Sequence, residues 1–360
     1  MSNEILTYGL ENLAKSINTA YETAIEYDGG LANYIAMGPN AIQVKHGWFD
    51  DSIGVSILTA TAAEGNALTV SAADAAGVEV GDYLYQKADG KGYVVSQKAG
   101  QTINVTALDG ESVAQVGAFN VFVPSNIEGS ESRRNVKHQA KEVTNYTEIF
   151  ERGVKISNSA LASKSLDAST QIATQTNAAI QDIKNRFQNA VYNGIPDAGD
   201  EAEPRHFGGL NYFTKIEVKA DGGLTYKRIC QLIKKVRSKG GRPNFIAVNT
   251  VHNETLNKII LDNQRTTVDT TVIGVAANTF IDPVSGAKLA IIYDDACPMG
   301  TLFVGELNKL SYSYLRPLTV EPLGKKGDNV ELSIIQELTL EVHNGGNCFG
   351  KLTGLTYTEE

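Results

Sequence analysis

A single long helix is the sequence feature that most limits the folds open to this chain. Residues 169–193 repeat apolar side chains at helical spacing, with polar and charged side chains on the remaining faces. Asp167 or Ser169 can cap the start, and Gly194 with Pro196 beyond it ends the helix. About 25 residues at 1.5 Å each give a rod of about 37 Å, roughly twice the average helix length. One face of this predicted helix carries Ile172, Thr176, Ile180, Ile183, Phe187, Ala190 and Val191.

A second region, from about Val55 to Val123, has a different character. Its segments are short, rich in β-branched and aromatic residues, and separated by Gly and Asx turns at roughly ten-residue spacing. This pattern predicts a small all-β barrel or sandwich inserted into the chain, close to the lower size limit for independent folding. The segments are Ala67–Val70, Gly81–Tyr85, Gly92–Val95 and Thr102–Thr106.

The segments on either side of this module are extended or amphipathic. Residues 126–165 interleave apolar and charged side chains, and Val154–Ser157 alternates, which indicates long, partly exposed strands or an extended loop. Near the N-terminus, apolar residues from Ile5 to Tyr21 recur at helical spacing and predict a short amphipathic helix. The N-terminal segment is too poor in apolar residues to form a core of its own.

The C-terminal half alternates helices with buried strands and then becomes strand-rich, which is typical of a compact α/β unit followed by long strands. Asn344–Asn347 suits a tight turn after the last long strand. The predicted helices are Thr225–Lys239 and His252–Leu261. The predicted strands are Asn244–Asn249, Lys288–Tyr293, Thr301–Val304, Leu310–Leu315, Thr319–Leu323 and Asn329–Val342.

Motifs for catalysis, cofactors and metals are not found. No phosphate loop, dinucleotide fingerprint, HExxH or nucleophile elbow occurs, so no catalytic, cofactor-binding or metal site is expected. The carboxylate pairs Asp50-Asp51 and Asp294-Asp295 are interpreted as turn or surface acids. His252-Asn253-Glu254 is interpreted as a helix start capped by Asn249 or Thr250. The three cysteines lack metal-ligand spacing and are expected to be reduced thiols.

Charge and hydropathy narrow the classes of partner. The net charge is −9 and the pI is near 5.2, so tight binding to nucleic acid phosphates is not expected. No stretch reaches the ~18 to 20 apolar residues that cross a bilayer, and no signal peptide is expected at the start of the chain.

Several stretches, taken in order, resemble one protein family. They are HGWFDDSI, YTEIFERGVKIS, RFQNAVYNGI, RHFGGLNYF, GGRPNFIAVN and VELSIIQELTLEVHNGG. Together with the order of elements they are similar to tailed-bacteriophage major capsid proteins of the Hong Kong 97-type fold. The resemblance implies an α+β fold with an N-arm, an extended loop, a peripheral domain with a long spine helix, and an axial α/β domain. In this chain a small all-β domain is inserted in addition.

By position, the resemblance divides the chain into six segments. These are the N-terminal arm (1–54), the inserted β-barrel-like domain (55–125), the extended-loop return (126–168), the spine helix and linker of the peripheral domain (169–222), the axial domain (223–300), and the peripheral strands with the C-terminus (301–360).

The resemblance also implies a function and partners. The chain would be a structural protein and no enzyme, assembling as hexamers and pentamers into an icosahedral or prolate head around double-stranded phage DNA. Portal protein would be a partner, scaffolding and decoration proteins are candidates, DNA would be enclosed without tight binding, and no membrane is involved. The location would be the virion capsid, after assembly in the host cytoplasm. Tyr146, Ile149 and Phe150 are the candidates for packing between subunits.

Three other interpretations stay open at this point. An encapsulin-like nanocompartment shell shares the fold and would contain a cargo enzyme. A phage tail or adhesin protein would form a trimer or fibre, which the long central helix argues against. An enzyme with the α/β part as its catalytic domain would need convergent polar residues, and the sequence shows none.

Overall fold

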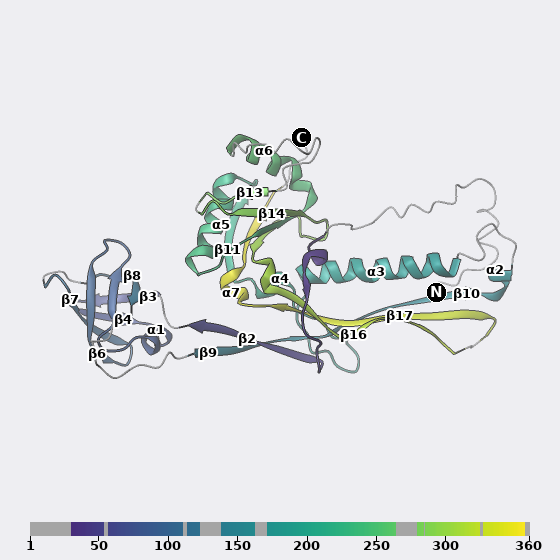
Figure 1. Ribbon diagram of the computed structural model, residues 1–360, viewed down its shortest axis with the longest axis horizontal. Helices are drawn as coiled ribbons and strands as arrows, with labels where there is room; N and C mark the ends of the chain where they lie inside the picture. Colours follow the sequence, from purple (N-terminus) through teal and green to yellow (C-terminus); the bar gives the residue numbers. More distant parts are fainter. Residues whose placement is uncertain are drawn as a thin grey trace, which may run out of the picture. The chain divides into compact units, whose positions relative to one another are not determined.

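The computed structural model describes residues 30–53, 57–110, 114–122, 138–162, 171–263, 279–283, 285–324 and 327–356 (Figure 1). The chain divides into two compact units. The larger unit is formed by residues 1–48 and 142–360, and the smaller unit by residues 49–141. The predicted N-terminal helix lies outside the described residues.

The smaller unit is a closed β-barrel with the strand order β3-β4-β7-β6-β5-β8. Alternate side chains point inward and fill it, and its core contains Tyr93 and Phe119 with no exposed surface. The short helix α1 (Ala72–Gly77) begins where Ser71 Oγ accepts a hydrogen bond from the amide of Asp74. The predicted barrel or sandwich is thus a closed barrel. Its strands are β3 (Ile57–Glu64), β4 (Ala67–Val70), β5 (Tyr83–Gln86), β6 (Gly92–Ala99), β7 (Thr102–Ala107) and β8 (Gly117–Phe122).

The chain runs to the barrel along β2 (Lys45–Ile53) and returns along β9 (His138–Tyr146). These two strands pair with each other as a separate two-stranded sheet, which we call the ribbon. The long strands predicted between residues 126 and 165 are β9 and β10 (Glu148–Ser157).

A four-stranded sheet and the long helix form one half of the larger unit. The sheet order is β1-β16-β17-β10, and α3 (Gln171–Asn193) packs against β10 and β17 (Figure 1). The helix predicted at 169–193 is confirmed over residues 171–193, and its first two residues lie outside the described part of the chain. β1 is Ala36–Met37, β16 is Leu310–Pro322 and β17 is Asn329–Val342.

Two strands predicted in this sheet are in fact one. Leu310–Leu315 and Thr319–Leu323 form the single strand β16, whose register against β17 shifts on both sides of Arg316. These irregularities take up the residues around Pro317, which has no amide hydrogen for the ladder. Pairing with β17 keeps the strand continuous.

A six-stranded mixed sheet forms the other half of the larger unit, in the order β11-β18-β15-β12-β14-β13. Along β12, Phe245 and Ala247 enter the core shared with α3, whereas Ile246 and Val248 enter a second core with α5 and α6. The strands are β11 (Ile216–Gly222), β12 (Phe245–Val248), β13 (Thr279–Ile281), β14 (Lys288–Tyr293), β15 (Thr301–Gly305) and β18 (Gly350–Leu355). The helices are α5 (Tyr226–Ser238) and α6 (Asn253–Asn263).

Short helical turns connect these layers. Asn344 adopts a left-handed backbone with φ of 52° and leads into the single turn α7 (Gly345–Cys348), close to the tight turn predicted there. All three cysteines are buried, and none of them forms a disulfide. In the part of the chain that the structure describes, no helix is both long and apolar enough to cross a membrane. The remaining turns are η2 (Leu31–Tyr34), α2 (Asn158–Ala162), α4 (Leu210–Phe213), η3 (Thr250–His252) and η4 (Leu307–Lys309).

Candidate assembly interface

The three residues proposed for inter-subunit packing lie close together in sequence but differ in exposure. Tyr146 ends β9 and is half-buried, and Ile149 in β10 is 44% exposed. Phe150 is 3% exposed, and its ring lies 6.3 Å from the rings of Phe187 and Phe207. The side chains of Tyr146 and Ile149 are therefore open to a neighbouring molecule, whereas the ring of Phe150 packs inside its own subunit.

A buried carboxylate fixes the start of β10. Glu337 on β17 is 3% exposed and accepts a hydrogen bond of 2.7 Å from Thr147 Oγ1, which lies between β9 and β10. Arg205 and Arg316 approach the same carboxylate at 3.0 and 2.8 Å. Two cations offset the cost of burying one charge, so the junction between β9 and β10 is held in a defined place.

A second buried carboxylate holds the start of the ribbon. Glu341, near the end of β17, accepts hydrogen bonds from His46 on β2 at 2.8 Å and from His343 at 3.0 Å. Ser311 donates at 3.1 Å and Ser313 donates as well. Burial alone would raise the pKa of Glu341, but these hydrogen bonds, with that of His343 the strongest, lower it to about 2.

The lowered pKa of Glu341 predicts acid sensitivity. A carboxyl group with a depressed folded-state pKa stabilises the fold above its ordinary value of 4.5, and this contribution is lost as the pH falls towards about 2. We expect Glu341→Gln to lower the urea midpoint at pH 7, and the difference from wild type to shrink below about pH 4.5. Glu321→Gln, at an exposed position on β16, is the control and should show little difference at any pH. A Glu341→Gln effect independent of pH would contradict the assignment.

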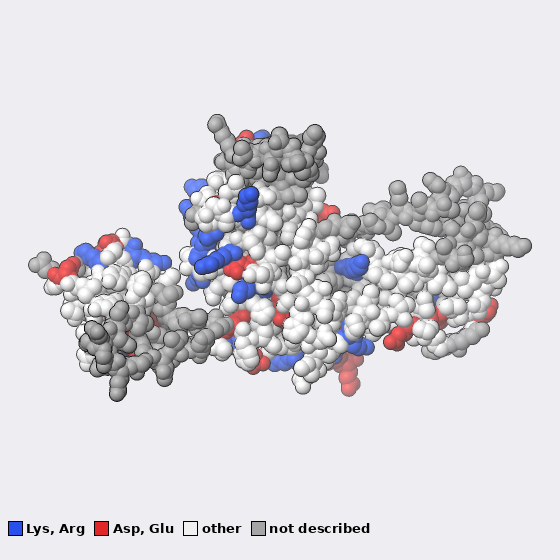
Figure 2. Space-filling view, viewed as in Figure 1, with Lys and Arg blue, Asp and Glu red and all other residues white. Residues whose placement is uncertain are grey.

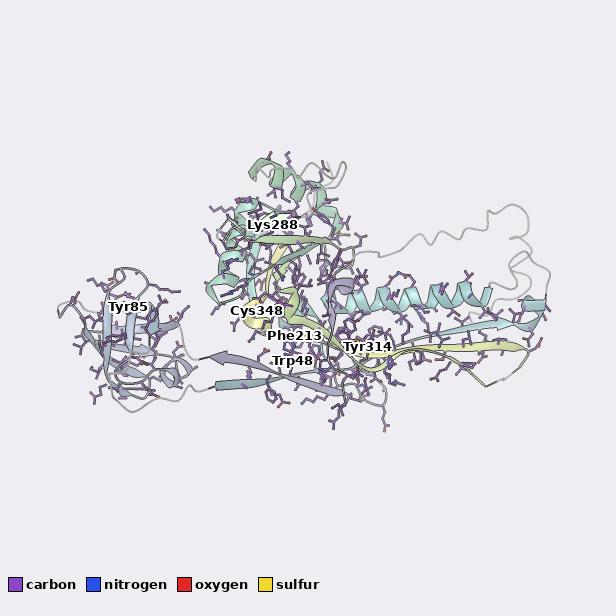
Figure 3. The ribbon with its side chains drawn as sticks, viewed as in Figure 1. Trp48, Tyr85, Phe213, Lys288, Tyr314 and Cys348 are labelled. Atoms are coloured by element: carbon purple, nitrogen blue, oxygen red, sulfur yellow. The ribbon has the colours of Figure 1, made fainter. Side chains whose placement is uncertain are left out.

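Aromatic packing adds to this attachment. Trp48 on β2 is 6% exposed, and its ring lies 5.6 Å from Phe213 and 5.9 Å from His343 (Figure 3). Trp48 is the only tryptophan in the chain, so its fluorescence reports on the larger unit at the start of the ribbon.

A third buried carboxylate joins three distant segments, and we call this group the Asp294 cluster. Asp294 is 2% exposed and accepts hydrogen bonds from Gln188 Nε2 at 2.8 Å and Tyr192 OH at 2.9 Å, both on α3. The amides of Leu31 and Ala296 donate to it at 2.8 and 2.9 Å. Asp294 begins the turn after β14, as one of the two interpretations had it, because its carbonyl accepts a hydrogen bond from the amide of Cys297. It is not a surface acid, since its carboxylate is enclosed by donors from three parts of the chain.

The segment that precedes Leu31 enters this cluster at a position where only glycine fits. A Cβ on Gly30 would lie 1.3 Å from Gln188 Nε2 and 2.7 Å from Asp294 Oδ2. The close approach lets the amide of Leu31 reach the carboxylate, so the entry of the N-terminal segment into the larger unit is fixed.

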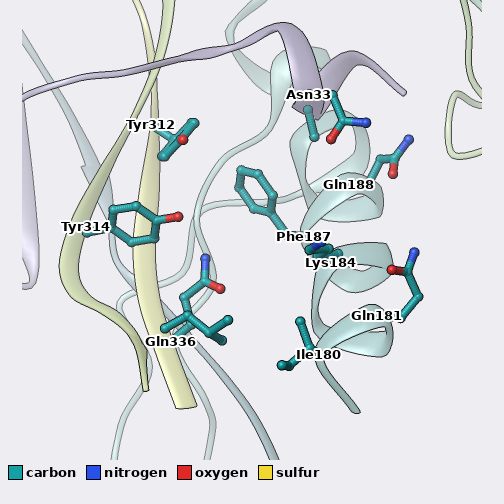
Figure 4. Close-up of a pocket in the computed structure, with 11 residues that line it drawn as sticks. Asn33, Ile180, Gln181, Lys184, Phe187, Gln188, Tyr312, Tyr314 and Gln336 are labelled. Atoms are coloured by element: carbon teal, nitrogen blue, oxygen red, sulfur yellow. The ribbon is translucent and has the colours of Figure 1, made fainter. Parts of the chain in front are cut away.

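A groove with a cavity of about 270 Å³ lies beside this entry point (Figure 4). The walls of the groove are formed by η2, α3, β16 and β17, and Phe187 projects between α3 and the two tyrosines of β16. We call it the α3 groove, and it is lined by Ala32, Asn33, Ile180, Gln181, Lys184, Phe187, Gln188, Tyr312, Tyr314, Leu318 and Gln336.

The remaining motifs from the sequence have structural roles. Asn249 Oδ1 accepts a hydrogen bond from the amide of Val251 and caps η3, as predicted, and His252 Nε2 lies 2.7 Å from the carbonyl oxygen of Met299. Asp50 and Asp51 lie within strand β2 and not in a turn. Within the described ranges, no group of three or more His, Cys, Asp or Glu side chains could hold a metal ion.

The chain matches one family of known proteins over most of its length. Residues 31–356 match the family described as SU10 major capsid protein. The chain belongs to this family. It is a structural subunit of a capsid shell, a component of the virion, and it assembles with copies of itself. No curated protein sequence matches this capsid protein.

Solved structures show the same fold at low sequence identity. The capsid of an empty GTA particle aligns with a TM-score of 0.54 and 9% identity, covering 95% of each chain. The capsid of cyanophage A-1(L) aligns with a TM-score of 0.53 and 12% identity, over 96% of this capsid protein and 100% of that chain. A structure from Mycobacterium phage Bobi aligns with a TM-score of 0.51 and 12% identity, covering 98% of each chain. The Hong Kong 97-like fold predicted from the sequence is confirmed.

Surface charge on this capsid protein is uneven despite its acidic total. Lys and Arg side chains gather over α5, whose sequence contains five of them and no acid (Figure 2). Some are used within the subunit: Lys235 Nζ donates to the carbonyl of Glu217 at 3.1 Å, and Arg237 pairs with the buried Asp282 at 2.6 Å. Part of this basic surface therefore serves contacts within the subunit.

The residues that sequence reasoning missed in this capsid protein are its buried carboxylates. Glu337 and Glu341 lie in the part of β17 where polar and apolar residues alternate, a pattern that by itself indicates a solvent-exposed polar face, so the sequence contains no signal of their burial. The local contact of Asp294 with the amide of Ala296 gives no sign of its burial, because its other partners, on η2 and α3, are 263, 106 and 102 residues away.

Proposed function

We propose that this capsid protein builds the icosahedral or prolate head of a tailed phage, as hexamers and pentamers around double-stranded DNA, and that it has no enzymatic activity. The ribbon is the observation that carries the proposal. A two-stranded sheet is marginally stable alone, and β2 and β9 pair only with each other among the described strands. Neighbouring copies would supply the missing cover and gain stability from closure of the lattice.

Electron microscopy of the expressed protein tests this proposal. Uniform closed particles with five-fold and six-fold units are expected. A small, stable oligomer at every concentration tested would contradict it. Particles that contain a cellular enzyme and no nucleic acid after infection would favour an encapsulin-like compartment.

We further propose the finer assignments of partners and parts. Assembly would take place in the host cytoplasm with portal protein, and scaffolding and decoration proteins are candidate partners. The net charge of −9 favours DNA that is enclosed and not tightly held, since acidic side chains repel the phosphates. Residues 169–222 and 301–360 would form the peripheral domain and residues 223–300 the axial domain. Strong DNA binding by assembled shells at physiological salt would contradict the loose enclosure.

Ile149 and Tyr146 are proposed as contacts between subunits, and Ile149 gives the sharper test because it is 44% exposed on β10. We expect Ile149→Asp to prevent closed particles, since a carboxylate would be buried without a partner at the contact, while the subunit keeps its fold. Ile149→Val is the matched control and should still assemble. Normal particles from Ile149→Asp, seen by electron microscopy, would remove Ile149 from the interface; unchanged Trp48 emission confirms that the variant folds.

A further inference from the structure

The α3 groove has the composition of a docking site for an apolar helix. Three aromatic rings line it, those of Phe187, Tyr312 and Tyr314. The ring centroids of Phe187 and Tyr312 are 6.0 Å apart, and those of the two tyrosines are 5.3 Å apart. Leu318, at the irregular part of β16, is 37% exposed at the rim. An apolar side chain that entered this space would exchange water for aromatic contact.

The chain itself delivers a segment to this groove. Gly30 and Leu31 are buried in the Asp294 cluster, and the next two residues, Ala32 and Asn33, already line the groove. Residues 1–29 therefore connect directly to its wall. Because residues 1–29 are joined to the groove wall through Gly30 and Leu31 alone, they are present at a high effective concentration at the groove.

The sequence of that segment is complementary to the groove. Leu6, Leu10, Leu13, Ile17 and Tyr21 recur every three or four residues, the spacing of anchors on a helix that binds in a groove. Residues 1–29 contain five acids and one lysine, while Lys184 lies exposed on the groove wall. A helix over residues 5–21 would be about 25 Å long, and the eight residues before Gly30 can span up to about 28 Å.

We propose that the α3 groove binds the N-terminal segment of the same polypeptide, with the Leu6–Leu13–Ile17 face as an amphipathic helix against Phe187, Tyr312 and Tyr314. Docking closes the apolar surface of α3 and β16 with the subunit's own arm. A second copy's arm and a separate partner protein are the competing occupants, and the experiment separates them.

Cysteine cross-linking in assembled particles tests the proposal, because the three native cysteines are buried. The test pair is Leu13→Cys with Lys184→Cys. The first control pair, Lys15→Cys with Lys184→Cys, places the thiol two residues along, on the opposite helix face. The second, Leu13→Cys with Lys258→Cys, moves the partner to an exposed lysine on α6. Mild oxidation, non-reducing electrophoresis and peptide mass spectrometry identify each bond.

The test pair is expected to form a bond within one chain, about tenfold faster than either control pair. If the test pair instead yields cross-linked dimers and larger oligomers, the groove is occupied by the arm of a second copy, which overturns the assignment to the same chain. Equal rates for all three pairs would mean an undocked arm and would also overturn it. If the test pair forms no bond and a different protein is found bound to the groove in the particles, the occupant is a separate partner and the proposal is overturned.

Discussion

Asp294→Ala is expected to lower the free energy of unfolding of the larger unit by about 3 to 5 kcal/mol. Truncation leaves four hydrogen-bond donors without their acceptor inside the protein, and each such group costs about 1 to 3 kcal/mol unless water reaches it. The N-terminal segment, α3 and the turn after β14 would all lose their common contact. Urea unfolding followed by Trp48 emission measures the effect.

The neighbouring acid provides the control for this change. Asp295 is exposed, and its carbonyl, not its side chain, accepts a hydrogen bond from Asn249. Asp295→Ala should therefore change the urea midpoint very little, within about 0.5 kcal/mol. A similar loss from both variants would mean that Asp294 acts through general surface charge and not through its buried hydrogen bonds.

Phe150→Ala is expected to destabilise the larger unit by about 3 to 5 kcal/mol, because removal of the Phe150 ring leaves a cavity against the rings of Phe187 and Phe207. The loss should appear in unfolding of the subunit itself. Particle yield would fall as a consequence of the lower stability, and the variant would show a reduced urea midpoint before any assembly step.

Ile149→Ala, one residue earlier on the same strand, separates folding from assembly. Because Ile149 is 44% exposed, its truncation should cost less than about 1 kcal/mol in unfolding. An unfolding loss as large as that of Phe150→Ala would show that Ile149 is packed within the subunit. It would then leave Tyr146 as the remaining candidate contact.

The elements that are set by local pattern could be predicted from the sequence. The strands β14 and β17 have the residues expected of them, and the helix α3 ends at the expected residue, because periodicity and flanking turn residues mark these ends. The continuity of β16 could not be predicted, because a proline and neighbouring irregularities look like a break until the pairing with β17 is known. Long-range pairing decides such cases.

In the candidate interface, too, some features could be predicted from local sequence pattern and others depend on long-range contacts. Phe150, Val154 and Ile156 alternate along β10 and all face the core, so the two-residue period of the strand could have placed Phe150 inside. The Asp294 cluster had no comparable signal. Its donors come from η2, α3 and the turn after β14, and only the folded chain brings them together.

The arrangement of the ribbon bears on how such subunits can change over evolution. The barrel's first strand, β3, is hydrogen-bonded to its last, β8, so its two ends emerge side by side, and both connect to the paired strands β2 and β9. A module joined in this way can be exchanged without rethreading the rest of the chain. The site is thus a position at which one domain could replace another in every copy of a particle.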